Sequence, residues 1–583
     1  MRKTKIVCTL GPATDNEKVL KKLMLAGMDV ARLNMSHQER EEQKVRADAV
    51  KKIRKGLSLP IALLLDTKGP EIRIGKFSTS KIDLKLNQKF CLLMDDVVGD
   101  ETKVSVSYKD LYKDVKPGVK ILIDDGLVEL EVKNCSEKVI ECTVLNPGTL
   151  SANKSINIPE ISLSLPFINP KDKKDIKFAV QEDFDFIAAS FTRSADDIRL
   201  LKKELCKNNG DHIKIIAKIE NSEGIKNIDE ILTVSDGIMV ARGDLGVEVP
   251  IEDIPIIQKK LVKKACATGK YVIIATQMLD SMVSHPRPTR AECTDVANAI
   301  YDGAGAIMLS AETAAGKYPV QAVKTMATIA ERTEQDVDYK KKFSEMDLPV
   351  KATVTSAISH STCATAHELD ATCIITVSKS GRTAEVISKY KPACPILAGT
   401  TSKTVMRQMN LLFGVTPLLM KEKKGIDELF DHIVSAVYDK GYVKKGDLAI
   451  LTAGIPFGVS GTTNLLKVQL IGNVLVSGTG INKYHACANL CVCQNEQEAK
   501  KNFIPGDILV IPETSDKISK LLKEAAGIIT ESDGLDSHAA ITANNLCKPT
   551  IVGAKNATKL LKSGTTVTLD AAKGIVFSNV GFA

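Results

Sequence analysis

Residues 213–243 read IKIIAKIENSEGIKNIDEILTVSDGIMVARG and contain two short apolar runs on either side of a segment with helical periodicity. The runs, 213–220 and 237–243, are rich in β-branched residues and nearly free of charge. A strand, a helix and a second apolar strand in this order are typical of a parallel sheet that is buried on both faces. The stretch therefore predicts repeated strand-helix units.

The same unit recurs along the first 345 residues. The other runs are TKIVCTL (4–10), DVARLNMS (29–36), IALLLDT (61–67), DFIAASF (185–191), YVIIATQ (271–277) and AIMLSAE (306–312). Eight parallel strands with intervening helices close into a (β/α)8, or TIM, barrel, and the pieces outside one long insertion come to roughly the 250 residues typical of that fold. We predict an α/β chain whose barrel is formed by residues 1–69 and 166–345.

An insertion interrupts this pattern after the third run. Residues 70–165 consist of short alternating segments such as KVIECTVLN, separated by Pro-Gly and Asp-Asp-Gly turns, which predicts an inserted β-barrel lid domain. An insertion in a βα loop stands over the carboxyl end of the barrel strands, where such enzymes place their chemistry. We expect this domain to exclude water from a site below it.

Two further domains follow the barrel. Residues 346–472 return to an α/β pattern, with strands such as CIITVS and DLAILTAG, and residues 473–583 form a smaller unit that carries PGDILVIPETSD. At 583 residues, several domains are expected, because one hydrophobic core seldom organises so long a chain.

Composition narrows the function classes. No apolar run approaches the roughly 20 residues of a membrane span, and the N-terminus lacks the pattern of a secretory signal. The net charge of +8 is modest and interspersed, which favours small anionic substrates over nucleic acid. The fourteen cysteines are scattered through the chain, so we expect reduced thiols and a cytoplasmic protein, with no membrane or nucleic-acid partner.

Polar residues stand at the carboxyl ends of five predicted strands, which face the mouth of a barrel. A lone polar residue there is about as often structural as functional, but five strands together favour function. The residues are Arg32, Asn34 and Ser36; Asp66 and Thr67; Lys218 and Glu220; Asp244; and Thr276.

Two carboxylates in this set, Glu220 and Asp244, offer the hard oxygen ligands that Mg²⁺ prefers. Lys218 lies two residues before Glu220, so both side chains point to the same side of their strand. A lysine beside two metal-binding carboxylates would stay cationic and could stabilise a transferring phosphoryl group. The alternative is a buried ion pair between Lys218 and its neighbours.

Long motifs across about the first 470 positions resemble those of the pyruvate kinase family. They include TKIVCTLGPATD, ARLNMSH, LLLDTKGPEIR, IIAKIEN, IMVARGDLGVE, IIATQMLDSM and PTRAECTDVANAIYDGAGAIMLSAET. The resemblance implies transfer of the phosphoryl group of phosphoenolpyruvate to ADP, giving pyruvate and ATP, in a homotetramer.

The resemblance also implies a role for each residue at the mouth. Glu220 and Asp244 would bind Mg²⁺ or Mn²⁺, Lys218 and Arg32 the phosphoryl group, and the backbone of Gly243 and Asp244 the substrate carboxylate, with Thr276 near the carbon that is protonated. Asn34, Ser36, Asp66 and Thr67 match the K⁺ site, and Glu71 matches the K⁺-dependent form of the family. Arg73, His37 and Lys171 are candidates for contact with ADP.

The run TVSKSGRTAEV places a glycine turn between a strand and a helix. By itself this pattern favours a plain turn with helix caps, although the start of a helix also suits phosphate. The resemblance implies a sugar-phosphate or nucleotide effector site, together with the loop that begins at Ala453, and leaves the effector open. The residues are Ser378, Lys379, Ser380, Gly381, Arg382 and Thr383.

The last unit resembles the swivelling phosphohistidine domain of phosphoenolpyruvate-utilising enzymes, which some bacterial pyruvate kinases carry, through LDSHAAITANN around His538. Asp536 replaces the usual Thr and Asn544 the usual Arg, which adds repulsion and removes a clamp for phosphate. We expect a structural or interfacial role. The alternatives are a synthase or dikinase relative using His538, a carbon-carbon lyase on a related Mg²⁺ barrel, and a non-catalytic metabolite sensor.

Overall fold

The computed structural model describes residues 1–36, 39–346, 353–423, 425–455, 463–472 and 474–578. These residues belong to two compact units, residues 1–352 with 378–419 and residues 353–377 with 420–583. All fourteen cysteines carry free thiols. None of the helices in the described ranges combines the length and the apolar character that a bilayer crossing needs.

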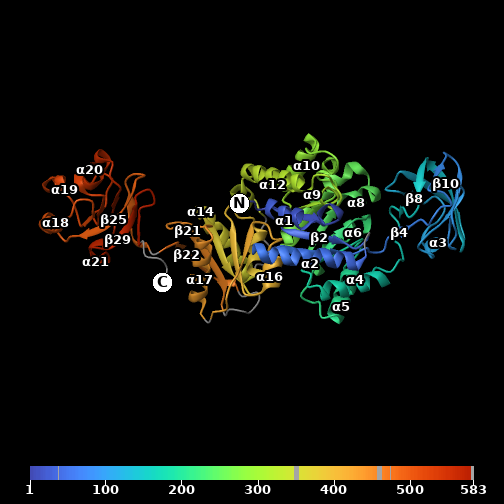
Figure 1. Ribbon diagram of the computed structural model, residues 1–583, viewed down its shortest axis with the longest axis horizontal. Coiled ribbons are helices and arrows are strands. Elements are labelled where there is room, and N and C mark those ends of the chain that lie inside the picture. The colour runs from blue at the N-terminus through green and yellow to red at the C-terminus, as the bar shows by residue number, and fades with distance from the viewer. Residues whose placement is uncertain (37–38, 347–352, 424, 456–462, 473, 579–583) are drawn as a thin grey trace. The chain divides into compact units, whose positions relative to one another are not determined.

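A closed barrel of eight parallel strands forms the centre of the first unit and confirms the predicted (β/α)8 fold (Figure 1). Every predicted run contains one strand, and the strands are buried almost throughout because helices cover their outer side. The strands are β1 (Lys5–Thr9), β2 (Val30–Asn34), β3 (Ala62–Asp66), β13 (Phe186–Ala189), β14 (Lys214–Ile219), β15 (Gly237–Ala241), β16 (Tyr271–Ala275) and β17 (Ala306–Leu309), in the spatial order β1-β17-β16-β15-β14-β13-β3-β2.

Helices connect these strands. The caps show why the sequence starts and stops them where it does: Thr289 and Glu292 form a capping box at the start of α10, and Gly269 ends α9 with a φ of +72°. The helices are α1 (Glu17–Ala26), α2 (Arg40–Leu57), α4 (Pro170–Gln181), α5 (Ala195–Lys207), α6 (Ser222–Lys226), α7 (Ile228–Val234), α8 (Arg242–Glu248), α9 (Ile254–Thr268), α10 (Arg290–Asp302), α11 (Ala311–Ala314), α12 (Pro319–Asp336) and α13 (Tyr339–Ser344).

The segment between β3 and β13 is a β domain, as the alternating pattern predicted. Its larger sheet has seven strands in the order β4-β12-β8-β9-β10-β6-β7, and β11 pairs with β5 in a second sheet. The elements are β4 (Ile72–Arg73), β5 (Lys81–Leu84), β6 (Lys89–Leu93), β7 (Lys103–Ser105), α3 (Leu111–Asp114), β8 (Lys120–Ile123), β9 (Val128–Cys135), β10 (Val139–Asn146), β11 (Gly148–Ser151) and β12 (Ser155–Asn157).

The first unit also contains residues 378–419, with α15 (Arg382–Lys389), β19 (Ile396–Thr400), α16 (Lys403–Met409) and β20 (Val415–Leu419). Helix α16 attaches to the barrel through the guanidinium of Arg407. Its Nε lies 2.6 Å from Asp185 Oδ1 and its Nη2 lies 2.8 Å from Asp183 Oδ2. This segment is therefore joined to the barrel by two ion pairs, of which the one with Asp185 is buried.

The second unit contains strands β18 (Cys373–Val377), β21 (Leu448–Gly454) and β22 (Thr463–Leu470) and a further sheet. Strand β18 pairs with β21, which pairs with β22, and α14 (Val354–Glu368) and α17 (Ile426–Asp439) contact these strands. An eight-stranded sheet in the order β23-β30-β29-β25-β26-β27-β28-β24 follows. Its elements are β23 (Val474–Ser477), β24 (Thr479–Gly480), β25 (His485–Val492), α18 (Glu496–Asn502), β26 (Ile508–Ile511), α19 (Ser519–Glu524), β27 (Gly527–Thr530), α20 (His538–Leu546), β28 (Thr550–Val552), α21 (Ala557–Leu560), β29 (Thr566–Asp570) and β30 (Ile575–Ser578).

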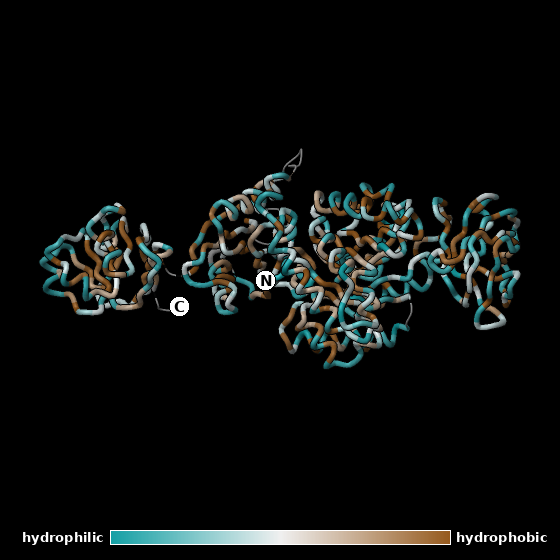
Figure 2. Tube along the Cα trace, turned by 90° about the horizontal axis from the view of Figure 1, so that it is seen from above, coloured by the Kyte–Doolittle hydropathy of each residue, from teal (hydrophilic) through white to brown (hydrophobic). Residues whose placement is uncertain are grey.

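Separate apolar cores hold the barrel and the inserted β domain together. The barrel core combines strand residues such as Ile6 and Leu63 with helix residues such as Leu23 and Leu261, and the β domain packs around Phe90. Figure 2 shows hydrophobic stretches of the chain mainly inside its compact parts and hydrophilic stretches mainly on their outside. Because the strands are fixed on both faces, the side chains at their carboxyl ends are held by a rigid support.

Candidate active site

Arg32 is fixed at the barrel mouth by its strand neighbours. On β2 it lies between β1 and β3, and its Nε is 2.6 Å from Asp66 Oδ2 while its Nη1 donates to Thr9 Oγ1 at 2.8 Å. The Arg32 side chain is only 9% exposed. The remaining guanidinium N–H groups are thus held in a defined direction, which suits recognition of a phosphoryl group.

Lys218 lies at the centre of a buried charge network. Its Nζ is 2.8 Å from Glu220 Oε1 and 3.2 Å from Asp66 Oδ1, and it donates to Ser190 Oγ at 2.8 Å. Burial by itself would lower the Lys218 pKa, but Asp66, Glu220 and Asp244 outweigh it and raise that pKa. Lys218 is therefore a permanent cation at the mouth.

Asp66 shares this network from the other side. Burial would raise its pKa, but the positive charges of Arg32 and Lys218 outweigh burial and hold the Asp66 pKa below its usual value. The carboxylate is thus ionised, and it contacts both cations and the Ser190 hydroxyl. The alternative interpretation from the sequence, that Lys218 only forms a buried ion pair, is correct in part. Lys218 is paired with carboxylates, but it also lines a cavity.

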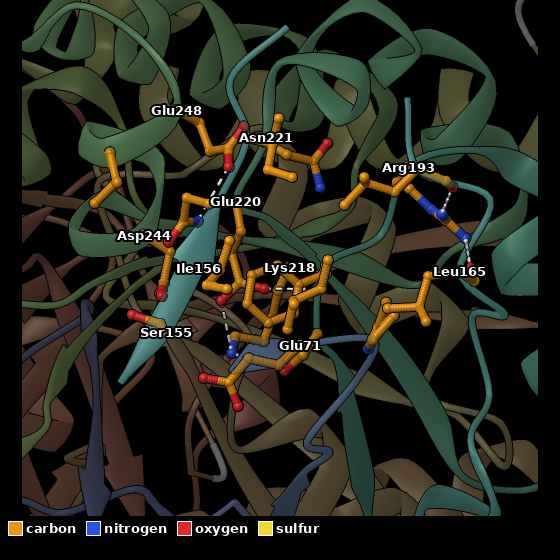
Figure 3. A pocket seen from close by; sticks show the side chains of 18 of the residues that line it. Glu71, Ser155, Ile156, Leu165, Arg193, Lys218, Glu220, Asn221, Asp244 and Glu248 are labelled. Carbon is orange, nitrogen blue, oxygen red and sulfur yellow. Dashed lines mark hydrogen bonds and ion pairs between the residues drawn. The ribbon is translucent and has the colours of Figure 1, made fainter. Parts of the chain in front are cut away.

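Glu220 and Asp244 differ in how their oxygens are engaged. Glu220 Oε2 accepts the Phe191 N–H at 2.6 Å, and Oε1 faces Lys218. Burial, with Asp244 adding to it, raises the Glu220 pKa. Within the described ranges, the Asp244 carboxylate has no hydrogen bond or ion pair, and it faces the cavity next to Glu220 (Figure 3).

The carboxylates of Glu220 and Asp244 are the donors available to a divalent metal at the barrel mouth. The described residues contain no cluster of three or more His, Cys, Asp or Glu side chains that could enclose an ion. Two carboxylates at an open cavity instead fit an ion such as Mg²⁺, which keeps several positions for substrate and water. The residues present therefore fit the expected ion.

A cavity of about 720 Å³ lies over this network. Figure 3 shows Lys218, Glu220, Asp244 and Glu71 directed into it. The inserted β domain supplies part of the wall through Arg73, Asp124, Asp125, Ile156 and Asn157. The barrel mouth and the inserted domain thus enclose one site.

Thr276 and Gly243 contact each other beside this cavity, although neither is part of its lining. The Gly243 N–H donates to Thr276 Oγ1 at 2.7 Å, and that hydroxyl donates to the Ala275 carbonyl at 2.6 Å. Thr276 has a φ of +68°. A non-glycine residue in this region is strained, and such strain is concentrated at functional sites.

The residues expected to bind K⁺ are brought together, but not all are equally available. Asn34 and Ser36 line the cavity, and Asn34 pairs with Asp66 across β2 and β3. The Thr67 hydroxyl accepts the Ser190 N–H at 3.1 Å and lies 3.2 Å from the Ala188 carbonyl. The Thr67 carbonyl also accepts a hydrogen bond, from the Ser190 hydroxyl at 2.7 Å, so both oxygens of Thr67 are engaged with the segment that follows β13.

The nucleotide candidates are placed differently from one another. Arg73 lines the cavity, with its Nη2 2.7 Å from Glu71 Oε1 and its Nη1 donating to the Asn153 carbonyl at 2.7 Å. Lys171 instead donates to the Met35 carbonyl at 2.7 Å and pairs with Asp175 at 3.0 Å. His37 lies outside the described residues.

The candidate effector turn precedes α15. Gly381 has a φ of +79°, so a glycine is needed to turn the chain into the helix. Lys379, Ser380 and Arg382 are exposed, and the Arg382 guanidinium pairs with Glu385 at 2.6 Å. Most of the companion loop that starts at Ala453, residues 456–462, lies outside the described residues.

His538 begins helix α20 in the second unit. Its Nδ1 lies 2.9 Å from Thr514 Oγ1, and its Nε2 lies 3.2 Å from Asp516 Oδ1. Both ring nitrogens therefore have polar neighbours, and a carboxylate faces Nε2. This arrangement adds a second acidic group to Asp536, which the sequence had already placed near the histidine.

Several cavity residues were missed from the sequence. Ser190 joins Lys218 to Asp66, and it follows the fourth barrel strand, where the rule for strand ends could have found it. Asp124 and Asp125 were interpreted only as turn residues. Asn157 and Glu248 meet across the cavity wall, with Asn157 Nδ2 donating to Glu248 Oε1 at 3.0 Å, and no local signal pairs them.

The chain is similar to known proteins along its whole length. Family models described as pyruvate kinase barrel domain, pyruvate kinase alpha/beta domain and PEP-utilising enzyme mobile domain match residues 1–323, 356–469 and 503–574. Pyruvate kinases of Sporosarcina psychrophila and Geobacillus stearothermophilus are 46% and 47% identical over at least 98% of each chain.

A solved structure shows the same similarity. The crystal structure of a pyruvate kinase from Cryptosporidium parvum matches with a TM-score of 0.77 at 38% identity. The match covers 81% of this chain and 96% of that one.

Proposed function

The chain belongs to the pyruvate kinase family and transfers the phosphoryl group of phosphoenolpyruvate to ADP, and we propose that this reaction takes place in the cavity at the barrel mouth. The observation that carries the proposal is Lys218, a buried cation 2.8 Å from Glu220 and directed into that cavity. A fixed cation beside Arg32 suits a reaction that moves negative charge from one oxygen to another.

Glu220 and Asp244 would hold Mg²⁺ or Mn²⁺ in this site. When bound, the ion would supply Lewis-acid stabilisation of phosphoryl and enolate oxygens. The support for this assignment is the Asp244 carboxylate, which faces the cavity beside Glu220.

The chain's own groups divide the work between two steps. Arg32 and Lys218 would bind the phosphoryl oxygens and hold them in line with ADP, which provides most of what phosphoryl transfer requires. The N–H groups of Gly243 and Asp244 would receive the substrate carboxylate. Thr276 Oγ1 accepts the Gly243 N–H and donates to the Ala275 carbonyl, so substrate binding at Gly243 would open an acceptor position on this hydroxyl for a water in the relay that protonates the enolpyruvate left by the first step.

Other roles complete the site. Asn34, Ser36, Asp66 and Thr67 would hold K⁺, with Glu71 as the acid of the K⁺-dependent form. Arg73 would contact the phosphates of ADP, with Lys171 and His37 as further candidates, and the inserted β domain would close over both substrates. Closure would exclude water, which could otherwise accept the phosphoryl group.

Regulation and assembly belong to the same proposal. Residues 378–383 would bind a phosphate-bearing effector, the protein would form a homotetramer, and it would act in the cytoplasm. The domain boundaries predicted from the sequence, at residues 70, 166, 346 and 473, are proposed as the limits of the barrel, the inserted β domain, the effector-binding domain and the C-terminal domain.

A coupled assay for pyruvate and ATP tests the main proposal. The full-length protein should form both products in equal amounts from phosphoenolpyruvate and ADP, and Glu220→Gln should lose the reaction while remaining folded. Full activity in this variant would place the chemistry elsewhere in the chain.

Phosphotransfer through His538 is the second candidate. We propose that it makes no contribution, because Asp516 and Asp536 repel phosphate from the ring and Nε2 already faces Asp516 at 3.2 Å. Incubation with ³²P-labelled phosphoenolpyruvate should leave no acid-labile label in the chain, and label that disappears in His538→Ala would reverse this view. Formation of pyruvate and ATP in the coupled assay would also exclude the alternative that the protein is a non-catalytic metabolite sensor.

A further inference from the structure

The segment that carries Thr276 is held in an unfavourable backbone conformation. Thr276 and the next residue, Gln277, have φ values of +68° and +54°. Two consecutive non-glycine residues in the left-handed region persist only where the surroundings hold them. Some neighbouring group must therefore fix the turn that follows β16.

Arg242 supplies that fixing contact. Its Nη2 donates to the Thr276 carbonyl at 2.9 Å, and its Nε donates to the Ala275 carbonyl at 3.3 Å. The next N–H along the chain, that of Gly243, donates to the Thr276 hydroxyl at 2.7 Å. Arg242 thus holds the backbone of Thr276 through contacts that do not involve the Gly243 N–H.

Arg242 is itself held by a third element of the barrel. Its Nη1 and Nη2 lie 2.6 Å and 2.7 Å from the two carboxylate oxygens of Asp295 on α10. The Arg242 side chain is only 13% exposed. A planar guanidinium can serve a carboxylate and two carbonyls together, whereas a lysine ammonium lacks this fork.

We propose that Arg242, held by Asp295, is a positioning residue that fixes Thr276 for the protonation of enolpyruvate. This inference rests on the proposed function, because it requires the role assigned to Thr276. In that step the C=C electron pair of enolpyruvate forms a new C–H bond at the methylene carbon, and the C–O bond becomes the carbonyl of pyruvate. The proton comes from solvent and is relayed by the Thr276 hydroxyl. Arg242 is not expected to contact either substrate.

The test separates the two half-reactions in the full-length protein. Exchange of the pyruvate methyl hydrogens with ²H₂O, followed by NMR, reports enolisation, and a coupled assay reports turnover. A displacement of the reacting group by about 1 Å costs up to about a hundredfold, so Arg242→Lys should slow exchange by about ten- to a hundredfold. The KM for phosphoenolpyruvate should change little, since Arg242 does not bind it.

A double-mutant cycle decides whether the effect passes through Thr276. Thr276→Ala should slow exchange, and adding Arg242→Lys to it should cause little further loss, because residues that act as one unit are not additive. An undiminished effect of Arg242→Lys in the Thr276→Ala background would overturn the inference. Slow exchange in Thr276→Ala with normal exchange in Arg242→Lys would overturn the inference alone, whereas normal exchange in Thr276→Ala would refute the role of Thr276 and the inference with it.

Two further variants guard against a folding defect. Arg46 forms a comparable two-point pair with Asp15, at 2.5 Å and 2.9 Å, on the outside of the same barrel. Arg46→Lys should therefore leave exchange unchanged, and slow exchange there would overturn the inference by showing that any such pair matters. If Arg242→Lys lowers the Tm of the barrel, Asp295→Asn decides: it keeps Arg242 and should slow exchange in the same direction, and normal exchange would overturn the inference.

Discussion

The Lys218 ammonium lies 2.8 Å from the Glu220 carboxylate, and both side chains are buried at the barrel mouth. This pairing keeps a positive charge where negative charge develops during phosphoryl transfer. The charge is not needed in the same way when a proton leaves or joins the methyl carbon of pyruvate. The two half-reactions should therefore respond differently to its loss.

Lys218→Met should lower turnover of phosphoenolpyruvate by at least about 10²–10³, the range for loss of one charge-stabilising donor. Exchange of the pyruvate methyl hydrogens should persist in the same protein. Methionine approximates the length of the lysine stem, so the barrel should stay folded, as circular dichroism would show. Joint loss of turnover and exchange would contradict the separate roles of Lys218 and Thr276.

The metal site should depend on Asp244. Removing divalent ions with a chelator should abolish turnover, and Mg²⁺ or Mn²⁺ should restore it. In Asp244→Asn the dissociation constant of Mn²⁺, measured by electron paramagnetic resonance, should rise about tenfold or more, because an amide is a weaker ligand for a hard cation than a carboxylate. Glu223→Gln is the matched control, since Glu223 lines the same cavity and accepts a hydrogen bond from Ser162. Equal affinities in Asp244→Asn and the wild type would exclude Asp244 as a ligand.

Much of this site could be predicted from the sequence, because the functional side chains of a parallel barrel lie at the carboxyl ends of its strands. Arg32 on β2 and Lys218 on β14 were found by reading which polar residues follow each apolar run, and the register places Asn34 beside Asp66. Ser190, which directly follows β13, obeys the same rule.

Contacts between distant segments could not be predicted in this way. Asn157 and Glu248 are 91 residues apart in the sequence and belong to different domains. No local sequence pattern at either residue therefore predicts their contact. Arg242 was quoted within a family motif, yet its bonds to Ala275 and Thr276 depend on how neighbouring strands end in space. Side-chain direction beyond the strand end is set by tertiary packing, which periodicity does not encode.

K⁺ should be needed for full activity. Glu71 is an acid, paired with Arg73 at 2.7 Å in the cavity wall, so it supplies no positive charge that could replace a missing cation near Asn34 and Asp66. Replacing K⁺ by tetramethylammonium at constant ionic strength should therefore reduce kcat sharply, and added K⁺ should restore it with saturation. The same kcat in both salts would remove the K⁺ site from the proposal.

Glu248 should couple the inserted β domain to the metal-binding helix. It accepts the Asn157 amide at 3.0 Å, burial raises its pKa, and it ends α8, the helix that carries Asp244 in its first turn. The two elements also come close at a second point, since a Cβ atom added at Gly126, in the β8–β9 turn, would lie 3.9 Å from Val247 Cγ1. Closure of the inserted domain should therefore act on α8 directly.

Asn157→Ala should accordingly raise the KM for ADP and lower kcat/KM by up to about tenfold, the equivalent of one hydrogen bond worth about 1.4 kcal/mol. Glu248→Gln keeps an acceptor oxygen and should behave nearly as the wild type, whereas Glu248→Ala should match Asn157→Ala. The double variant should be no worse than either single one, because both remove the same bond. Asn146→Ala is the control, since the Asn146 amide donates to the Leu127 carbonyl within the inserted domain. Additive losses in the double variant would show that Asn157 and Glu248 act separately and that the domain does not close through this contact.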